Sequence, residues 1–225
     1  IVYVGLSADI LHEGHINILK KAHELGEVTV GLLTDQAIAS YKKIPHLSYK
    51  QREIVLKNMK FVKKVIPQST LDYRPNLKHL RPHYVVHGDD WKKGIQKKTR
   101  KKVINALKKW SGKLIEVKYD KDPKTAIYKS KFKNYSSPDL RVSKLSRLIE
   151  SKTIVRTIET HSALSALITD KMQLIKRNKF FSFDALWSSS LTDSLLRGKP
   201  DNQSVDYTAR FNMLNDIFEA TSKPL

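Results

Sequence analysis

The chain begins with the stretch IVYVGLSADILHEGH, residues 1–15. Its first six residues, Ile1–Leu6, are an apolar run without alternation, which is typical of a strand buried on both faces. A polar loop follows, and Ile16, Leu19 and His23 then recur at helical spacing. The stretch therefore predicts a strand, a loop and a helix, which is the first unit of an α/β fold.

The same alternation continues over the next hundred residues. Ser48 and Gln51 have the spacing of a capping box and predict a second helix start. A third helix is expected where Val103, Leu107 and Trp110 line one face. Regular alternation predicts a Rossmann-like parallel sheet, with ligands at the carboxyl ends of its strands near the switch in strand order. The further strands are expected at Val28–Thr34, Val65–Ile66, Tyr84–His87 and Leu114–Tyr119.

Residues 120 to 140 interrupt this pattern with polar and Ser/Pro-rich sequence. We therefore expect two domains, at residues 1–135 and 140–225, joined by a short connection. The second has fewer elements, which the sequence places at Leu140–Glu150 (helix), Thr153–Glu159 (strand), Ser162–Ile168 (helix), Phe183–Ser188 (strand) and about Ser204–Ala220 (helix).

The formal charge of +20 is concentrated in the first part of the chain. Residues 1–139 hold 29 Lys or Arg against 13 acids, and Lys92–Lys113 holds ten basic residues and no acid. Such a surface attracts nucleotide triphosphates or nucleic acid. A solvated lysine-rich face is the simpler interpretation, and a nucleic-acid-binding module stays open as an alternative.

The composition also limits the compartment and the kind of site. The chain has no cysteine, so disulfides and thiolate metal sites are excluded, and we expect a cytoplasmic protein. No apolar run reaches membrane-spanning length and no signal peptide is visible, so no membrane partner is expected. The chain opens on a strand without a methionine, and we expect that it is trimmed at both ends.

The segment His12-Glu13-Gly14-His15 opens the first helix and carries the chemistry. Two histidines three residues apart could chelate a metal or be ordinary core or surface histidines. A zinc site needs a third protein ligand, and no obvious cluster supplies one. Because Gly14 permits close backbone approach and a helix N-terminus attracts anions, the arrangement suits a triphosphate better than a metal.

Three ordered blocks resemble the cytidylyltransferase family, which includes the glycerol-3-phosphate and ethanolamine-phosphate cytidylyltransferases. They are the H-x-G-H segment at residues 12–15, S-Y-x-x-R at residues 48–52, and the strand followed by G-D-D-W at residues 86–91. H-x-G-H alone does not separate adenylyl from cytidylyl transfer, so an adenylyltransferase stays open. G-D-D-W favours CTP.

The resemblance implies direct attack of a phosphate or phosphonate oxygen on the α-phosphorus of CTP, with release of pyrophosphate. Catalysis is then positioning and charge stabilisation. By resemblance, His12 and His15 donate hydrogen bonds to the phosphate oxygens in the transition state. Lys43 or its neighbour Lys42 neutralises phosphates, and Arg52 reaches the same charges.

The resemblance also implies a nucleotide site with Mg²⁺ bound together with CTP. Asp9 would help to hold the magnesium ion or the geometry of the site, whereas no residue is assigned as a certain metal ligand. Asp90 and Trp91 lie where the family binds the nucleoside. For Lys42, Asp9 and Asp89 a structural role is an equal alternative. The nucleotide-binding set is Gly5, Leu6, Asp9, Gly14, His87, Gly88, Asp90 and Trp91.

One block of the family is missing. After the fifth strand the family carries G-I-S-[ST]-T, which binds the triphosphate, whereas this chain has YDKDPKT at residues 119–125. Either the loop has diverged or residues are missing from this stretch. We favour the second interpretation, because loops that bind ligands are often mobile.

Residues 140–225 resemble the start of a phosphoenolpyruvate mutase, of the isocitrate lyase-like barrel class. Thr160-His161, the segment ALWSSSL at 185–191 and RGKPD at 197–201 carry the resemblance. It implies phosphonate binding by Ser189 and by the backbone of Ser190 and Leu191, with Asp201 as an active-site acid. The alternative is that Trp187 is core at a strand end and the serines cap a helix.

A complete (β/α)₈ barrel takes about 250 residues, so we expect an incomplete barrel segment without mutase turnover. The alternative is a phosphoenolpyruvate mutase if the full-length chain completes the barrel. Together the two resemblances are similar to the bifunctional enzymes of phosphonate biosynthesis, including the fosfomycin pathway. They imply a small phosphonate acceptor, either 2-hydroxyethylphosphonate, which we favour, or 2-aminoethylphosphonate, and a homodimer.

Overall fold

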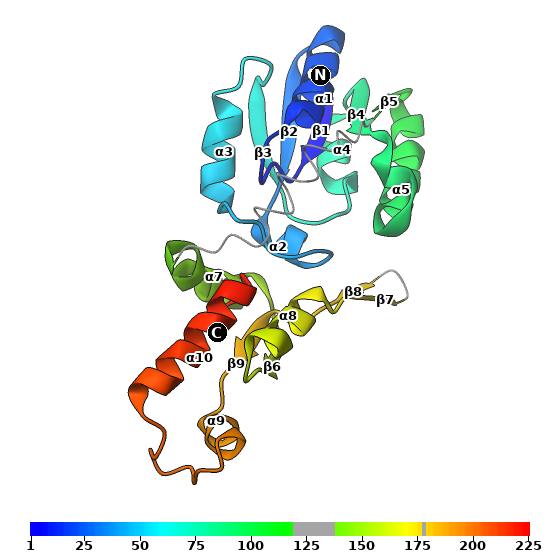
Figure 1. Cartoon of the computed structure of the whole chain (residues 1–225). Helices are drawn as coiled ribbons and strands as arrows, with labels where there is room; N and C mark the ends of the chain where they lie inside the picture. The colour runs from blue at the N-terminus through cyan, green and yellow to red at the C-terminus, as the bar shows by residue number, and fades with distance from the viewer. Residues whose placement is uncertain (119–137, 177–178) are drawn as a thin grey trace. The chain divides into compact units, whose positions relative to one another are not determined.

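The computed structural model describes residues 1–118, 138–176 and 179–225 (Figure 1). The chain divides into two compact units, Ile1–Asp122 and Pro123–Leu225. The domain boundary predicted at residues 135–140 falls mainly on residues outside the described part and stays a prediction. Each unit is treated by itself below.

The first unit is the predicted α/β fold. Its strands are β1 (Val2–Leu6), β2 (Val28–Leu33), β3 (Lys64–Gln68), β4 (Tyr84–Gly88) and β5 (Lys113–Val117). Its helices are α1 (Glu13–Leu25), α2 (Asp35–Ala39), α3 (Tyr49–Lys57), α4 (Arg74–Leu80) and α5 (Lys97–Leu107). Three 3₁₀ turns, η1 (Asp89–Lys92), η2 (Gly94–Gln96) and η3 (Lys108–Trp110), flank α5.

The five strands form one parallel sheet in the order β3-β2-β1-β4-β5. Strand β1 pairs with β2 along its whole length, from Val2 opposite Val28 to Leu6 opposite Leu32. With β4 it pairs at only two positions of the described sheet, Val2 opposite Tyr84 and Tyr3 opposite Val85. The strand order reverses between β1 and β4, and the pairing of these two strands ends before their carboxyl ends. Parallel sheets of this kind bind ligands at this place.

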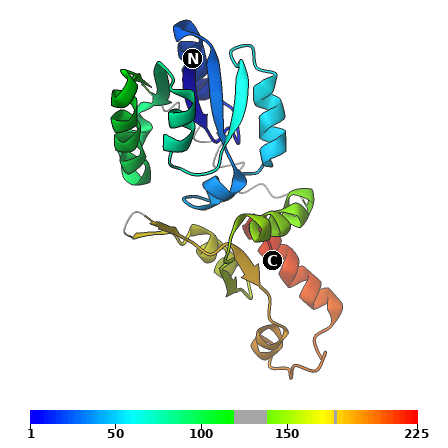
Figure 2. The same cartoon turned by 180° about the vertical axis from the view of Figure 1, so that it is seen from behind.

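Each face of the sheet carries its own pair of helices, as the views from opposite sides show (Figures 1 and 2). On one face, Leu19 of α1 and Leu56 of α3 pack against Val4 and Val30. On the other face, Leu77 of α4 and Val103 of α5 pack with Tyr3 and Val85. Alternate residues of a strand point to opposite faces, so a continuous apolar strand serves both layers.

The second unit contains α7 (Pro138–Ser151), α8 (Ala163–Lys171), α9 (Ser190–Leu196) and α10 (Tyr207–Ala220). Its strands are β6 (Thr157–Glu159), β7 (Leu174–Lys176), β8 (Lys179–Phe181) and β9 (Ala185–Trp187). β6 and β9 pair in parallel, and β7 and β8 form an antiparallel pair. The amide of Leu186 also donates to the carbonyl of Pro224 (2.8 Å), so the last residues run beside β9.

Several boundaries differ from the predicted ones. β3 spans five residues rather than two, because Lys64, Pro67 and Gln68 interrupt the apolar run that the prediction relied on. Pro67 is tolerated because β3 is an edge strand. The strand predicted at Thr153–Glu159 is limited to β6. The prediction also missed α2, α4, α9 and the β7–β8 pair, which are too short for a clear periodicity.

The described residues include no helix with both the length and the apolar character needed to cross a membrane.

Candidate active site

The loop between β1 and α1 places the two histidines of H-x-G-H. Ala8 lies in this loop with φ of 49°, a left-handed conformation that residues with a Cβ rarely adopt. Its side chain is buried in the core beside Leu6 and Ile18, which holds the turn in place. The chain then enters α1, whose N-cap is His12. Backbone strain of this kind is common in loops that form binding sites.

His12 and His15 are fixed by backbone hydrogen bonds to the same type of nitrogen. Nδ1 of His12 accepts from the amide of Gly14 (3.1 Å), and Nδ1 of His15 accepts from the amide of His12 (3.4 Å). An amide can only donate, so in each neutral imidazole the proton is on Nε2. The ring centroids are 4.0 Å apart. The pair therefore holds two Nε2–H donors at the N-terminus of α1.

The structure corrects the expectation for Arg52. Its side chain is 0% exposed and forms an ion pair with Asp35 (2.6 Å). The same guanidinium donates to the carbonyls of Ser7 (2.5 Å), Leu33 (2.9 Å) and Leu47 (3.2 Å). These four acceptors occupy the guanidinium, so Arg52 joins the ends of β1 and β2 to the loop before α3 instead of contacting phosphate.

Lys42 and Lys43 lie half-buried in the loop between α2 and α3, to which Arg52 is hydrogen-bonded at Leu47. Nζ of Lys42 donates to Oγ of Ser7 in the β1–α1 loop (3.1 Å). Asp9 of that loop accepts from the amide of Leu47 (3.0 Å). The two loops are thus joined directly. The hydrogen bond of Asp9 joins these loops, and its predicted part in holding magnesium or the geometry of the site stays a prediction, as does phosphate binding by Lys42 and Lys43.

His87 and Trp91 form a stacked pair at the end of β4. Their ring centroids are 3.8 Å apart with an interplanar angle of 4°. Trp91 is 1% exposed, and its Nε1 donates to Oε1 of Glu116 (2.8 Å). Trp91 is therefore packed in the core, and the expectation that it contacts the nucleoside is corrected. Its ring supports His87 instead.

Glu116 holds this arrangement from β5. Arg100 donates to both carboxylate oxygens of Glu116 (2.8 and 2.9 Å), and Nζ of Lys92 lies 3.7 Å from Oε2. The hydrogen bonds from Arg100 and Trp91 lower the pKa of Glu116 to about 2 in spite of partial burial. The carboxylate is charged at neutral pH and fixes Trp91, and through it His87.

The predicted glycines have different surroundings. A Cβ on Gly5 would clash with the side chain of Tyr73, so a glycine is needed here to leave room for this buried tyrosine, and its predicted contact with the nucleotide stays a prediction. Leu6 is buried in the core. A Cβ on Gly88 would lie 2.9 Å from Oδ1 of Asp90, whose carboxylate is half-exposed. The amide of Gly14 donates to Nδ1 of His12, the residue that caps the start of α1.

Three residues that shape the site were missed from the sequence. They are Asp35, Tyr73 and Glu116. Asp35 directly follows Thr34, the N-cap of α2, and Glu116 is an acid between the apolar Ile115 and Val117 of β5, next to a basic helix. A lone charge in such a strand predicts a buried partner and could have been recognised.

No group of three or more His, Cys, Asp or Glu that could hold a metal ion occurs among the described residues. The segment 119–125, which replaces the triphosphate-binding block, lies outside the described residues.

The basic stretch Lys92–Lys113 is partly paired. Arg100 and Lys92 contact Glu116, and Lys102 contacts Asp72 (3.0 Å). The remaining lysines of α5 lie on its outer face, away from the buried Val103. This placement agrees with a solvated face.

In the second unit, the predicted phosphonate-binding residues follow β9. Ser189 is the N-cap of α9 and accepts from the amide of Thr192 (3.4 Å). Oγ of Ser190 donates to Oδ2 of Asp201 (3.2 Å), so these two predicted residues are brought together, with Leu191 half-exposed beside them. Trp187 is 62% exposed, which contradicts its alternative assignment to the core.

Family models match both parts of the chain. Residues 3–143 match the family model described as cytidylyltransferase-like, and residues 145–225 match that of phosphoenolpyruvate phosphomutase. Among curated relatives, a glycerol-3-phosphate cytidylyltransferase of Bacillus spizizenii is 34% identical over 88 residues, 37% of this chain and 67% of the relative. An ethanolamine-phosphate cytidylyltransferase of Dictyostelium discoideum is 34% identical over 122 residues, 52% of this chain and 32% of the relative.

A solved structure, described as a lipopolysaccharide core biosynthesis protein of Thermoplasma volcanium, aligns with a TM-score of 0.45 and 26% identity. The alignment covers 53% of this chain and 97% of that one.

Proposed function

The chain belongs to the cytidylyltransferase-like family, and from this premise we propose that its first unit transfers CMP from CTP to a small phosphonate. An oxygen of the phosphonate attacks the α-phosphorus, the bond between that phosphorus and the bridging oxygen breaks, and pyrophosphate leaves with the bond's electron pair. The observation that carries the proposal is the paired orientation of His12 and His15, each with Nδ1 bound to backbone and its proton on Nε2.

The transition state gains negative charge on the phosphoryl oxygens as the acceptor oxygen arrives. Two neutral N–H donors at a helix N-terminus stabilise that charge without first having to reorganise. Lys42 and Lys43 supply positive charge from the opposite loop. Arg52 acts indirectly, because it fixes both loops on the sheet. Mg²⁺ would be carried by the phosphates of CTP.

The choice of a phosphonate rests on the second unit. Residues 145–225 match the phosphoenolpyruvate phosphomutase model, and a mutase of this kind produces a carbon–phosphorus bond. A transferase on the same chain is then suited to a phosphonate made downstream. We favour 2-hydroxyethylphosphonate over 2-aminoethylphosphonate, and a homodimer, on the resemblance alone.

Pyrophosphate release with each of the four nucleoside triphosphates tests the reaction. We expect turnover that requires CTP and a phosphonate together. Preference for ATP would contradict cytidylyl transfer and favour the adenylyltransferase alternative.

Phosphoenolpyruvate mutase activity is the second candidate, for the second unit. The match of residues 145–225 to the phosphoenolpyruvate phosphomutase model supports this candidate. Phosphorus NMR of the full-length protein with phosphoenolpyruvate would detect phosphonopyruvate directly.

A further inference from the structure

His87 is protonated on the opposite nitrogen from His12 and His15. Its Nδ1 lies 2.8 Å from the carbonyl oxygen of Gly88. A carbonyl oxygen can only accept, so Nδ1 donates and carries the proton. In a neutral ring, Nε2 then keeps its lone pair. Burial lowers the pKa of His87, which favours this neutral form at neutral pH.

The ring of His87 is held in a fixed orientation. It stacks on Trp91, which Glu116 holds by a hydrogen bond to Nε1, and Glu116 is itself held by Arg100. The charged groups that face His87 are Asp90, whose Oδ1 is 3.8 Å from Nδ1, and Glu116. The side chain is 12% exposed. Within the described residues no hydrogen bond to its Nε2 is formed.

His87 lies at the edge of the sheet where the proposed reaction would take place. It is the penultimate residue of β4, on the side where β1 and β4 stop pairing. The His87 ring lies 6.3 Å from that of Tyr73, on the face of the sheet that α4 and α5 cover. A Cβ on the next residue, Gly88, would point to the other face and lie 3.5 Å from Cδ1 of Ile18 in α1, one turn after His15. The carboxyl end of β4 therefore lies next to the first turns of α1.

We infer that His87 is a hydrogen-bond acceptor of this site and recognises a hydroxyl or amino group of a bound substrate, not a phosphate oxygen. A deprotonated phosphate oxygen has no proton to give and is repelled by the lone pair of Nε2. The inference rests on the proposed function, since it needs a substrate bound at the carboxyl end of β4. The donor can come from the nucleotide, as a ribose hydroxyl or the cytosine amino group, or from the phosphonate, as its hydroxyl.

Matched substrates separate these sources. CTP is compared with 2′-deoxy-CTP and with UTP, and 2-hydroxyethylphosphonate with ethylphosphonate, in the wild-type protein and in His87→Asn. Asparagine can still donate to the carbonyl of Gly88 but is too short to present an acceptor where Nε2 lies. We expect the wild type to favour the ligand with the donor about tenfold or more in kcat/KM, and His87→Asn to lose that preference for one pair.

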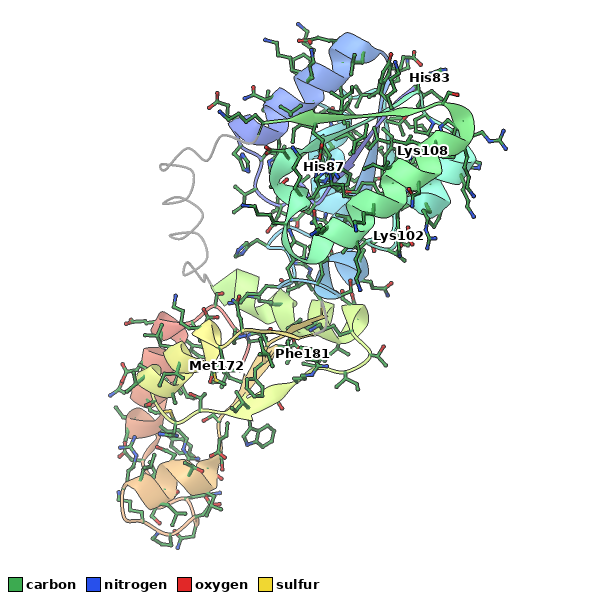
Figure 3. All side chains as sticks on the ribbon, turned by 90° about the vertical axis from the view of Figure 1, so that its right-hand side faces the viewer. His83, His87, Lys102, Lys108, Met172 and Phe181 are labelled. Atoms are coloured by element: carbon green, nitrogen blue, oxygen red, sulfur yellow. The ribbon has the colours of Figure 1, made fainter. Side chains whose placement is uncertain are left out.

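Two further variants control the experiment. His87→Gln can extend an amide oxygen toward the position of Nε2 and is expected to restore part of the preference. His83→Asn makes the same exchange just before the amino end of β4, at the other end of the strand from His87, and should leave every preference unchanged (Figure 3). If His87→Asn discriminates between all the pairs as the wild type does, the inference is wrong.

A readout independent of turnover is the nitrogen chemical shifts of the His87 ring in the ligand-free protein. The expected spectrum has protonated Nδ1 and unprotonated Nε2 at pH 7. A proton on Nε2, or on both nitrogens, would overturn the inference even if CMP transfer is confirmed. Conversely, failure of every acceptor to react with CTP would reject the proposed function while the ring assignment stands on its own.

Discussion

The two units differ in how much of their apolar side-chain surface is buried. Among the described residues, the first unit exposes three large apolar side chains, Ile1, Ile54 and Val55. The second exposes fourteen, among them Ile149 of α7, Ile168 of α8 and Leu195 of α9. The buried apolar cluster of the second unit is small and consists of Ala166, Leu186, Met213 and Ile217.

This difference shows what fixes a site in each unit. In the first unit, the buried side chains of Arg52 and Trp91 hold the loop after β1 and the ring of His87, so the geometry of the site follows from the core. In the second unit, Ser190 and Asp201 lie on a short helix and a loop beside exposed apolar surface. Apolar surface of this extent is usually covered by a further packed layer. Mutations should therefore have larger effects in the first unit than in the second.

The largest effect is expected from Arg52→Ala. The change leaves Asp35 and three backbone carbonyls without their buried partner, and breaking a buried pair costs about 3–5 kcal/mol. Chemical denaturation monitored in the first unit measures this loss. Lys57→Ala, which breaks the exposed pair with Glu53 on the same helix, is the control and should cost about 0.5 kcal/mol or less. Equal losses for both variants would contradict the role of Arg52 in joining β1 and β2 to the loop before α3.

His15→Ala and His12→Ala come next and test the chemistry of the first unit. Each removes one donor to the charge that develops in the transition state, so kcat should fall about a hundredfold or more, with a smaller change in CTP affinity. Steady-state kinetics with CTP and a phosphonate measure both constants.

The matched control is His79→Ala on the exposed side of α4, which should keep normal turnover. A well-folded His15→Ala protein with near-normal kcat would contradict the proposed mechanism.

A third prediction concerns pH. Burial lowers the pKa of His87 below its ordinary value of 6.5, so the unfolded chain takes up a proton first as the pH falls. The stability that depends on neutral His87 is complete above pH 6.5 and is lost below it, by at most about 1.4 kcal/mol per pH unit.

Denaturation between about pH 7.5 and 5.5, on either side of the ordinary histidine pKa, tests this dependence. His87→Asn should flatten it, whereas His83→Asn should not. An unchanged pH dependence in His87→Asn would show that another group is responsible.

The smallest effect is expected in the second unit. Leu195 is 63% exposed, so Leu195→Ser should change the free energy of unfolding by about 0.5 kcal/mol or less. Thermal denaturation of the purified protein measures it. A loss of several kcal/mol would mean that this surface is buried in solution, and the contrast between the two units would then disappear.

Much of the first unit could be predicted from local sequence. The apolar runs of β1, β2 and β4 and the capping box of Ser48 and Gln51 were identified correctly, because each depends on residues close together in the chain. The start of α1 at H-x-G-H and the parallel sheet follow from the same kind of pattern.

The partners of the site side chains were decided by the tertiary structure alone. Arg52 meets Ser7, Trp91 meets Glu116, and Tyr73 fills the space beside Gly5, over separations of 45, 25 and 68 residues. A motif specifies which residue types are present, but burial and distant hydrogen bonds decide whether a side chain faces the ligand or the core. For this reason the sequence determined the fold and the histidine pair, whereas only the folded chain placed Arg52 and Trp91 behind the site and left His87 at its edge.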